Sequence, residues 1–206
     1  YLSMLKNDKS LQATARQKNF LLRAYQGTVR LAHLISELLT ISRVERTGFV
    51  AQREKFDWEQ LMQEVIEDFT AKFKIGDQIE ITGEKIGEVF ADKNLLRQLL
   101  YNLLDNALKY GGKEKIQLAC HSQQENGRKI LIGSVADQGL GVAPKDIAGL
   151  FQPFVRGKNI LELDKEGTGL GLYICRLITL KHGGQIFYQP NQPKGSKFTF
   201  TLDVTE

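Results

Sequence analysis

Four short segments decide the fold of this chain: NLLDNALKY at residues 102–110, DQGLG at 137–141, FQPFVR at 151–156 and GTGLGL at 167–172. The first has the pattern of a helix, and the second and fourth are rich in glycine. Each segment alone is weak evidence, because glycine-rich turns and asparagine-bearing helices are common. Their combination predicts a site where a polar ligand approaches the backbone closely.

The predicted helix has one polar edge. Asn102, Asn106, Lys109 and Tyr110 are spaced i, i+4, i+7 and i+8, so they lie on one side, and leucine and alanine fill most of the rest. An unpaired amide inside a core costs about 1–3 kcal/mol. We therefore expect the two asparagines to face a ligand; helix-end or surface positions are the alternative.

Asp137 follows an apolar strand pattern at 130–135 and precedes Gly139 and Gly141. Its carboxylate is expected to leave the end of a buried strand as a hydrogen-bond acceptor. An Asx turn that only ends the strand is the alternative.

The glycines at 167, 169 and 171 stand directly before a predicted helix. Backbone N–H groups that converge at a helix start, together with the helix dipole, favour an anion such as phosphate. A flexible loop without a ligand is the alternative.

Together the four segments resemble the N, G1, F and G2 boxes of sensor histidine kinases. The resemblance implies ATP and Mg²⁺ as cofactors and a Bergerat-type fold. It makes Asn106 a neutral Mg²⁺ ligand, Lys109 a phosphate-neutralising cation, Tyr110 a packing residue near the nucleotide and Asp137 the acceptor of the adenine amino group. The nucleotide-binding residues that it implies are Asn102, Asn106, Lys109, Tyr110, Asp137, Gly139, Gly141, Phe154, Arg156, Gly167, Thr168, Gly169, Leu170 and Gly171.

The resemblance also implies a mobile lid between Arg156 and Glu166, with Phe151 and Phe154 at its base and Arg156 near phosphate. Many charged loops have no such role. Related ATPases carry a glutamate where this chain has Asn102, and an amide cannot accept a proton from water at neutral pH. Efficient ATP hydrolysis is therefore not expected, whereas phosphoryl transfer stays open.

A long amphipathic helix is predicted from Ala15 to Arg46, and the break at 47–56 is the best linker. We expect the apolar stripe to pack on another helix, in the chain or in a second subunit; packing on its own domain is the alternative. By resemblance, residues 1–49 are part of a dimerisation and phosphotransfer hairpin, and residues 50–206 are the catalytic domain. The phospho-accepting histidine would precede Tyr1, so the chain has no catalytic residue of its own. His33, His121 and His182 are interpreted as structural.

The remaining elements complete an α+β, two-layer sandwich of helices on a mixed sheet. Asp57 and Gln60 have the pattern of a capping box that opens a helix, and Asp92 is expected to cap the helix that stops at 111–112. Strands are predicted at 78–82, 89–91, 115–121, 129–136, 185–189 and 196–202, with a turn at 125–127 and a helix at 170–181.

Composition agrees with a globular fragment of a longer protein. The 206 residues carry a net charge of +4 and begin without methionine. No apolar run of about 18 residues predicts a membrane span, and the scattered basic residues do not favour nucleic acid. Cys120 and Cys175 are expected to be reduced thiols of a cytoplasmic protein.

These patterns lead to one functional hypothesis. The chain is expected to bind ATP and Mg²⁺ for transfer of the γ-phosphoryl group to an upstream histidine, and then to an aspartate of a response regulator. The intact protein is expected to be a homodimer whose parent chain can be membrane-anchored. Two alternatives stay open: a Ser/Thr kinase of the anti-sigma type, and a non-catalytic nucleotide-binding dimerisation module.

Overall fold

The computed structural model describes residues 14–112, 114–156 and 167–206. The chain divides between Ser42 and Arg43 into two compact units. The first unit contains most of α2 (Ala15–Glu45). The second unit contains the last turn of α2 and all other described elements. The assignment of 1–49 and 50–206 as functional domains stays a prediction.

The predicted long helix is confirmed as α2, and it begins at a capping box that the sequence analysis did not note. The backbone N–H of Thr14 donates to Oε1 of Gln17 at 2.8 Å, and the N–H of Gln17 donates back to Oγ1 of Thr14 at 3.3 Å. Several large apolar side chains of α2 are exposed: Leu31, Ile35, Leu38 and Leu39.

Five strands of the described chain form one mixed sheet in the order β2-β4-β5-β7-β6. Their bounds are β2 Ile79–Gly83, β4 Ile116–Glu125, β5 Arg128–Ala136, β6 Ile186–Pro190 and β7 Ser196–Asp203. β2 runs parallel to β4, and the other neighbouring pairs are antiparallel. The predicted turn between β4 and β5 is confirmed as Asn126-Gly127, both with the positive φ that two-residue hairpin turns of type I′ need.

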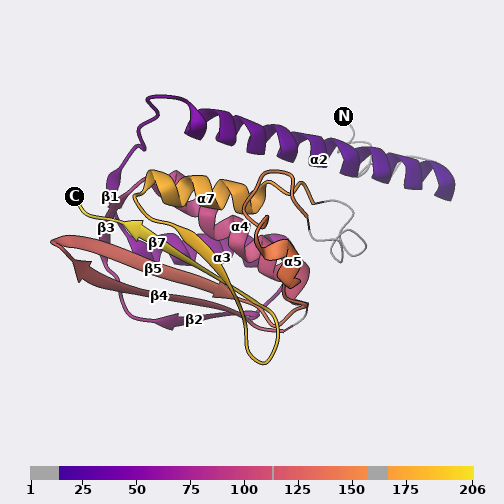
Figure 1. Ribbon diagram of the computed structural model, residues 1–206. Coiled ribbons are helices and arrows are strands. Elements are labelled where there is room, and N and C mark those ends of the chain that lie inside the picture. Colours follow the sequence, from indigo (N-terminus) through magenta and orange to yellow (C-terminus); the bar gives the residue numbers. More distant parts are fainter. Residues whose placement is uncertain (1–13, 113, 157–166) are drawn as a thin grey trace. The chain divides into compact units, whose positions relative to one another are not determined.

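Helices α3 (Trp58–Phe73), α4 (Lys93–Gly111) and α7 (Gly171–Lys181) lie on one face of this sheet (Figure 1). α4 is the central helix, in contact with α3, α7 and strands β4, β5 and β7. Six of its leucines are fully buried: Leu95, Leu96, Leu99, Leu100, Leu103 and Leu104. The predicted two-layer α+β sandwich is confirmed. The same core buries the side chains of Cys120 and Cys175, and burial raises the pKa of Cys120 to about 12.

Two described elements were not predicted. β1 (Glu54–Asp57) pairs antiparallel with β3 (Glu88–Ala91) in a separate two-stranded sheet, so the segment predicted as linker ends in a strand. α5 (Pro144–Ile147) is a single turn after the DQGLG segment. Neither is long enough to show a periodic pattern in the sequence.

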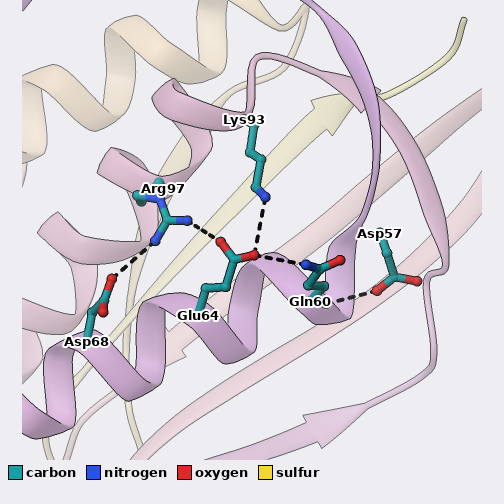
Figure 2. Close-up of polar contacts among 6 residues, drawn as sticks. All are labelled: Asp57, Gln60, Glu64, Asp68, Lys93 and Arg97. Carbon is teal, nitrogen blue, oxygen red and sulfur yellow. Dashed lines mark hydrogen bonds and ion pairs between the residues drawn. The ribbon is translucent and has the colours of Figure 1, made fainter.

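Both predicted helix caps are present. A side-chain oxygen of Asp57 accepts from the N–H of Gln60 at 2.8 Å, and one of Asp92 accepts from the N–H of Leu95 at 3.1 Å. The predicted capping box at α3 is wrong in its second half (Figure 2): the side-chain amide of Gln60 donates to Glu64 at 3.1 Å. Glu64, one turn along the helix, offers this amide a charged acceptor.

An ion-pair cluster joins α3 to the first half of α4 (Figure 2). The carboxylate of Glu64 lies 3.3 Å from Nζ of Lys93 and also pairs with Arg97, which lies 3.4 Å from Asp68. The hydrogen bond from Lys93, and then that from Arg97, lower the pKa of Glu64 against the opposing effect of burial. Exposed pairs contribute little stability each, but this cluster fixes the helix that carries the polar edge against its neighbour.

His182, at the end of α7, is fully buried, and its ring makes two hydrogen bonds. Its Nδ1 lies 2.8 Å from the carbonyl oxygen of Ile178, and its Nε2 lies 3.2 Å from the backbone nitrogen of Asp92. Because Nε2 must accept from that N–H, the ring is neutral with its proton on Nδ1. His182 therefore joins the end of α7 to the start of α4. His121 is exposed on β4, and His33 on α2 lies 3.3 Å from Glu37.

Candidate functional site

The polar edge of α4 meets the start of α7 at Asn102. The half-buried side chain donates from Nδ2 to the carbonyl oxygen of Gly171 at 3.3 Å. Only the amide nitrogen can serve this carbonyl, because a carboxylate would place an acceptor against an acceptor. Asn102 thus holds two of the four segments together.

The rest of the polar edge contains an ion pair. Asn106 and Tyr110 are half-buried, and Lys109 is exposed. Nζ of Lys109 lies 2.6 Å from Oδ2 of Asp105, one helical turn earlier. The cation predicted to neutralise phosphate is therefore paired with a carboxylate. Asp105 was missed in the sequence, although an acid four residues before a lysine is a recognised signal.

Asp137 directly follows β5 and is only 2% exposed. Its Oδ1 accepts from the N–H groups of Gly139 at 2.8 Å and Ser196 at 3.2 Å, so the Asx turn exists. The side chain of Asn191 donates to the carbonyl oxygen of Asp137 at 2.8 Å. In the part of the chain that the structure describes, no group donates a hydrogen bond to Oδ2.

Burial raises the pKa of Asp137, and the two backbone N–H groups oppose that shift. They bind the same oxygen and hold the carboxyl plane in place. The other oxygen is therefore an oriented acceptor in a buried setting, where a donor such as the amino group of a base gains most from binding. The Asx turn and the ligand site are compatible.

Three glycines allow close backbone packing at Asp137 and the neighbouring end of α4. A Cβ on Gly111 would lie 2.8 Å from Cβ of Asp137, and one on Gly195 would lie 2.0 Å from its carbonyl oxygen. A Cβ on Gly139 would lie 1.8 Å from the carbonyl oxygen of Tyr110. Gly139 therefore lets the end of α4 pass against the loop, a role beyond the predicted approach of a base. Gly111 and Gly195 were missed, although Gly111 stands at a predicted helix stop.

Gly141 closes the same loop in the left-handed region, at φ +70°. The next residue, Val142, donates its N–H to the hydroxyl of Tyr188 at 3.1 Å. This bond ties the loop to β6. Tyr188 was not predicted as part of the site.

The third segment meets the fourth through backbone atoms. The N–H of Phe154 donates to the carbonyl oxygen of Gly169 at 3.0 Å, and a Cβ on Gly169 would lie 3.0 Å from the carbonyl carbon of Phe154. The ring of Phe151 packs edge-on against Phe198, with centroids 6.4 Å apart. The Phe154 ring is 62% exposed, so this residue anchors the segment by its backbone.

The fourth segment leads into α7. Gly167 and Thr168 are half-buried, and Oγ1 of Thr168 accepts from the N–H of Leu170, a fully buried residue, at 3.2 Å. α7 then begins at Gly171, and no side chain among the described residues caps this end, so first-turn N–H groups are available for an anion. Half-buried Arg156 ends the described part of the third segment. The predicted lid at 157–166 and the segment before residue 14 lie outside the described residues.

Three junctions thus bring the four segments together: Asn102 with Gly171, Tyr110 with Gly139, and Phe154 with Gly169. Among the described residues, no group of three or more His, Cys, Asp or Glu side chains is placed to hold a metal. A metal at this site would take only an isolated ligand such as the amide of Asn106 from this part of the protein. That donor set fits Mg²⁺ held mainly by phosphates and water.

Residues 91–206 match the family model described as "Histidine kinase-, DNA gyrase B-, and HSP90-like ATPase". The chain belongs to this family, and residues 91–206 form an ATP-binding domain of it. The predicted resemblance to sensor histidine kinases is confirmed by the relatives that follow.

The chain is 33% identical to the adaptive-response sensory kinase SasA of Microcystis aeruginosa (strain NIES-843 / IAM M-2473) over 177 residues, which are 83% of this chain and 44% of SasA. The chain is also similar to the crystal structure of full-length ShkA in complex with AMPPNP, with a TM-score of 0.73. The two sequences are 26% identical, and the match covers 100% of this chain and 42% of ShkA. The nucleotide-free catalytic domain of the histidine kinase ThkA is 28% identical, with a TM-score of 0.59, over 75% of this chain and 99% of that domain.

The chain spans 44% of the length of this SasA, and 38% of the length of a second relative, the sensor histidine kinase RppB of Synechocystis sp. (strain ATCC 27184 / PCC 6803 / Kazusa), to which it is 33% identical. Within the described residues, no helix combines the length and the apolar character that crossing a membrane requires.

Proposed function

We propose that this chain is the kinase core of a sensor histidine kinase. It binds ATP with Mg²⁺ and positions the γ-phosphoryl group for transfer to a histidine upstream of Tyr1, from which the group passes to an aspartate of a response regulator. The observation that carries the proposal is that four separate segments meet through three junctions, and that one of these segments begins with the buried carboxyl group of Asp137.

Asp137 binds the base in this proposal. Two N–H groups hold Oδ1, and Oδ2 accepts from the amino group of adenine. Gly141, in the left-handed region, lets the loop turn beside the base. The ShkA structure, which contains AMPPNP, supports a nucleotide in the corresponding fold.

The start of α7 and the polar edge of α4 bind the phosphates. First-turn N–H groups of α7 donate to phosphate oxygens, and Lys109 and Arg156 supply positive charge. Asn106 offers its amide oxygen to Mg²⁺, which neutralises phosphate charge when bound. Catalysis then depends on positioning and charge stabilisation.

Asn102 favours transfer over hydrolysis. Its amide donates to the carbonyl oxygen of Gly171 and has no basic atom that could take a proton from water. A histidine of the phosphotransfer hairpin is then the nucleophile.

The exposed apolar residues of α2 support a homodimer in the intact protein. Leu31, Ile35, Leu38 and Leu39 are each 45% or more exposed. Burying a leucine or isoleucine side chain contributes about 1.5–3 kcal/mol, so a partner helix would stabilise this face. This observation favours the sensor kinase over the anti-sigma type of kinase, which needs no such helix. A cytoplasmic site of action is part of the proposal.

Calorimetric titration with a non-hydrolysable ATP analogue, with and without Mg²⁺, tests nucleotide binding. Asp137→Asn should weaken binding about ten- to a hundredfold, as for a hydrogen bond to a charged group of about 1.5–3 kcal/mol. The reason is geometric: an amide whose oxygen accepts from Gly139 and Ser196 must turn its NH₂ group toward the donor on the base.

The matched control is Asp77→Asn, the same change at an exposed turn. Equal affinity of Asp137→Asn and the wild type would contradict the proposed base-binding site. For the transfer step, the parent chain with its upstream helix should form an acid-labile, alkali-stable phosphohistidine with ATP. Binding without that product would favour the non-catalytic alternative.

A further inference from the structure

Asp105 places a negative charge next to Asn106, the proposed metal ligand. Asp105 precedes Asn106 in α4 and pairs with Lys109 at 2.6 Å. The two side chains are 24% and 42% exposed, so both reach solvent at the polar edge. Within the described residues, Asp105 has no second ion-pair partner at this distance.

The pair changes the electrostatics expected at the phosphate end. Lys109 alone would attract any polyphosphate, but the charge of Asp105 offsets part of that attraction. A nucleoside triphosphate carries about four negative charges, and bound Mg²⁺ cancels about two of them. A carboxylate at this position therefore repels the metal-free nucleotide about twice as strongly as the Mg²⁺ complex.

We propose that Asp105 is a specificity residue that makes nucleotide binding depend on Mg²⁺ by disfavouring metal-free triphosphate at the α4 edge. The inference rests on the proposed function, since it assumes phosphates beside Lys109. Asp105 itself is not a metal ligand in this proposal; it acts through its charge.

The quantity to measure is the ratio of the Kd without Mg²⁺ to the Kd with Mg²⁺, obtained by calorimetry with a non-hydrolysable ATP analogue. Asp105→Asn should tighten metal-free binding more than binding with Mg²⁺ and so lower the ratio about three- to tenfold, which is the Coulomb effect of removing one charge near the two extra negative charges of the metal-free nucleotide in water-like surroundings. The fall should shrink in high salt, which screens exposed charges.

Two variants serve as controls. Asp105→Glu keeps the charge and should keep the wild-type ratio. Glu67→Gln removes one negative charge from the exposed side of α3, where Gln63 can still donate to the new amide oxygen, and should leave the ratio unchanged. Thermal unfolding of each variant should show that the fold is retained.

The outcomes separate the inference from the proposed function. A wild type that binds with Mg²⁺ enhancement and an Asp105→Asn variant with the same ratio would overturn this inference alone. A lower ratio caused only by weaker binding with Mg²⁺ would also overturn it, because Asp105 would then support the metal or Lys109. No binding by the wild type would overturn the proposed function and this inference together.

Discussion

Gly139→Ala should disrupt the junction between the end of α4 and the loop after β5. The added Cβ would lie 1.8 Å from the carbonyl oxygen of Tyr110, 2.6 Å from its carbonyl carbon and 2.8 Å from Cα of Gly111. All three are backbone atoms, so no side-chain rotation can relieve the contact. The loop or the helix end must move by about 1 Å or more to restore van der Waals distance.

The losses of thermal stability and of nucleotide affinity in Gly139→Ala depend on where that movement occurs. Overpacking of this kind costs about 1–3 kcal/mol, and a domain of this size loses about 2–4 °C in Tm per kcal/mol. The leucine core of α4 lies elsewhere, so the fold should survive with a Tm lower by about 2–12 °C. Movement of the loop also shifts the N–H of Gly139, which holds Oδ1 of Asp137 at 2.8 Å. Nucleotide affinity should therefore fall at least about tenfold.

Thermal unfolding and calorimetry with the ATP analogue measure both effects. Gly27→Ala is the matched control, because a Cβ there meets nothing within 4 Å and alanine favours a helix over glycine. Wild-type Tm and affinity in Gly139→Ala would refute the packing argument. Weaker binding at unchanged Tm would also refute it, since Gly139 would then serve the ligand and not the junction.

The remaining predictions concern the two ends of α7. Burial lowers the pKa of His182, with Arg53 adding to the shift and Asp92 opposing it. The stability that the neutral His182 ring contributes should therefore be complete above the unfolded pKa of about 6.5 and be lost as pH falls below it. Urea unfolding at about pH 7.5 and 5.5 measures this loss. The difference in unfolding free energy between the two pH values should be smaller in His182→Gln than in the wild type. At the start of α7, Asn102→Asp should replace the hydrogen bond to the carbonyl oxygen of Gly171 by a repulsion between two oxygens. The free energy of unfolding should fall by about 1–2 kcal/mol. An unchanged Tm in thermal unfolding would contradict this.

Local signals explain what could be predicted of the fold. Asp92, the leucine pattern and the glycines at 111–112 all lie within or beside α4, and they gave its bounds to within one residue. β1 has no such signal. It is four residues long, and its partner β3 lies about 30 residues further along the chain, so the strand depends on a tertiary contact.

In the candidate site, too, local features could be predicted from the sequence, whereas contacts between distant segments could not. Residue types and spacing predicted that four segments form one site, because glycine turns and an amide-bearing helix edge are readable in a sequence; their roles in nucleotide binding stay predictions. The junctions were not readable, since Asn102 and Gly171 are 69 residues apart. Asp105 is different, because its pairing with Lys109 is local, within one turn of the same helix, and could have been predicted from the spacing.

The way the site is assembled bears on how its chemistry could change. Two of the three junctions are backbone contacts made possible by glycine. The third depends on a side chain, because Asn102 makes it by donating to Gly171. A carboxylate at 102, as in related ATPases, would bring a base for hydrolysis but remove the donor that the start of α7 needs. Under the proposed function, a change from phosphoryl transfer to hydrolysis therefore requires a compensating change at α7 as well as a new residue at 102.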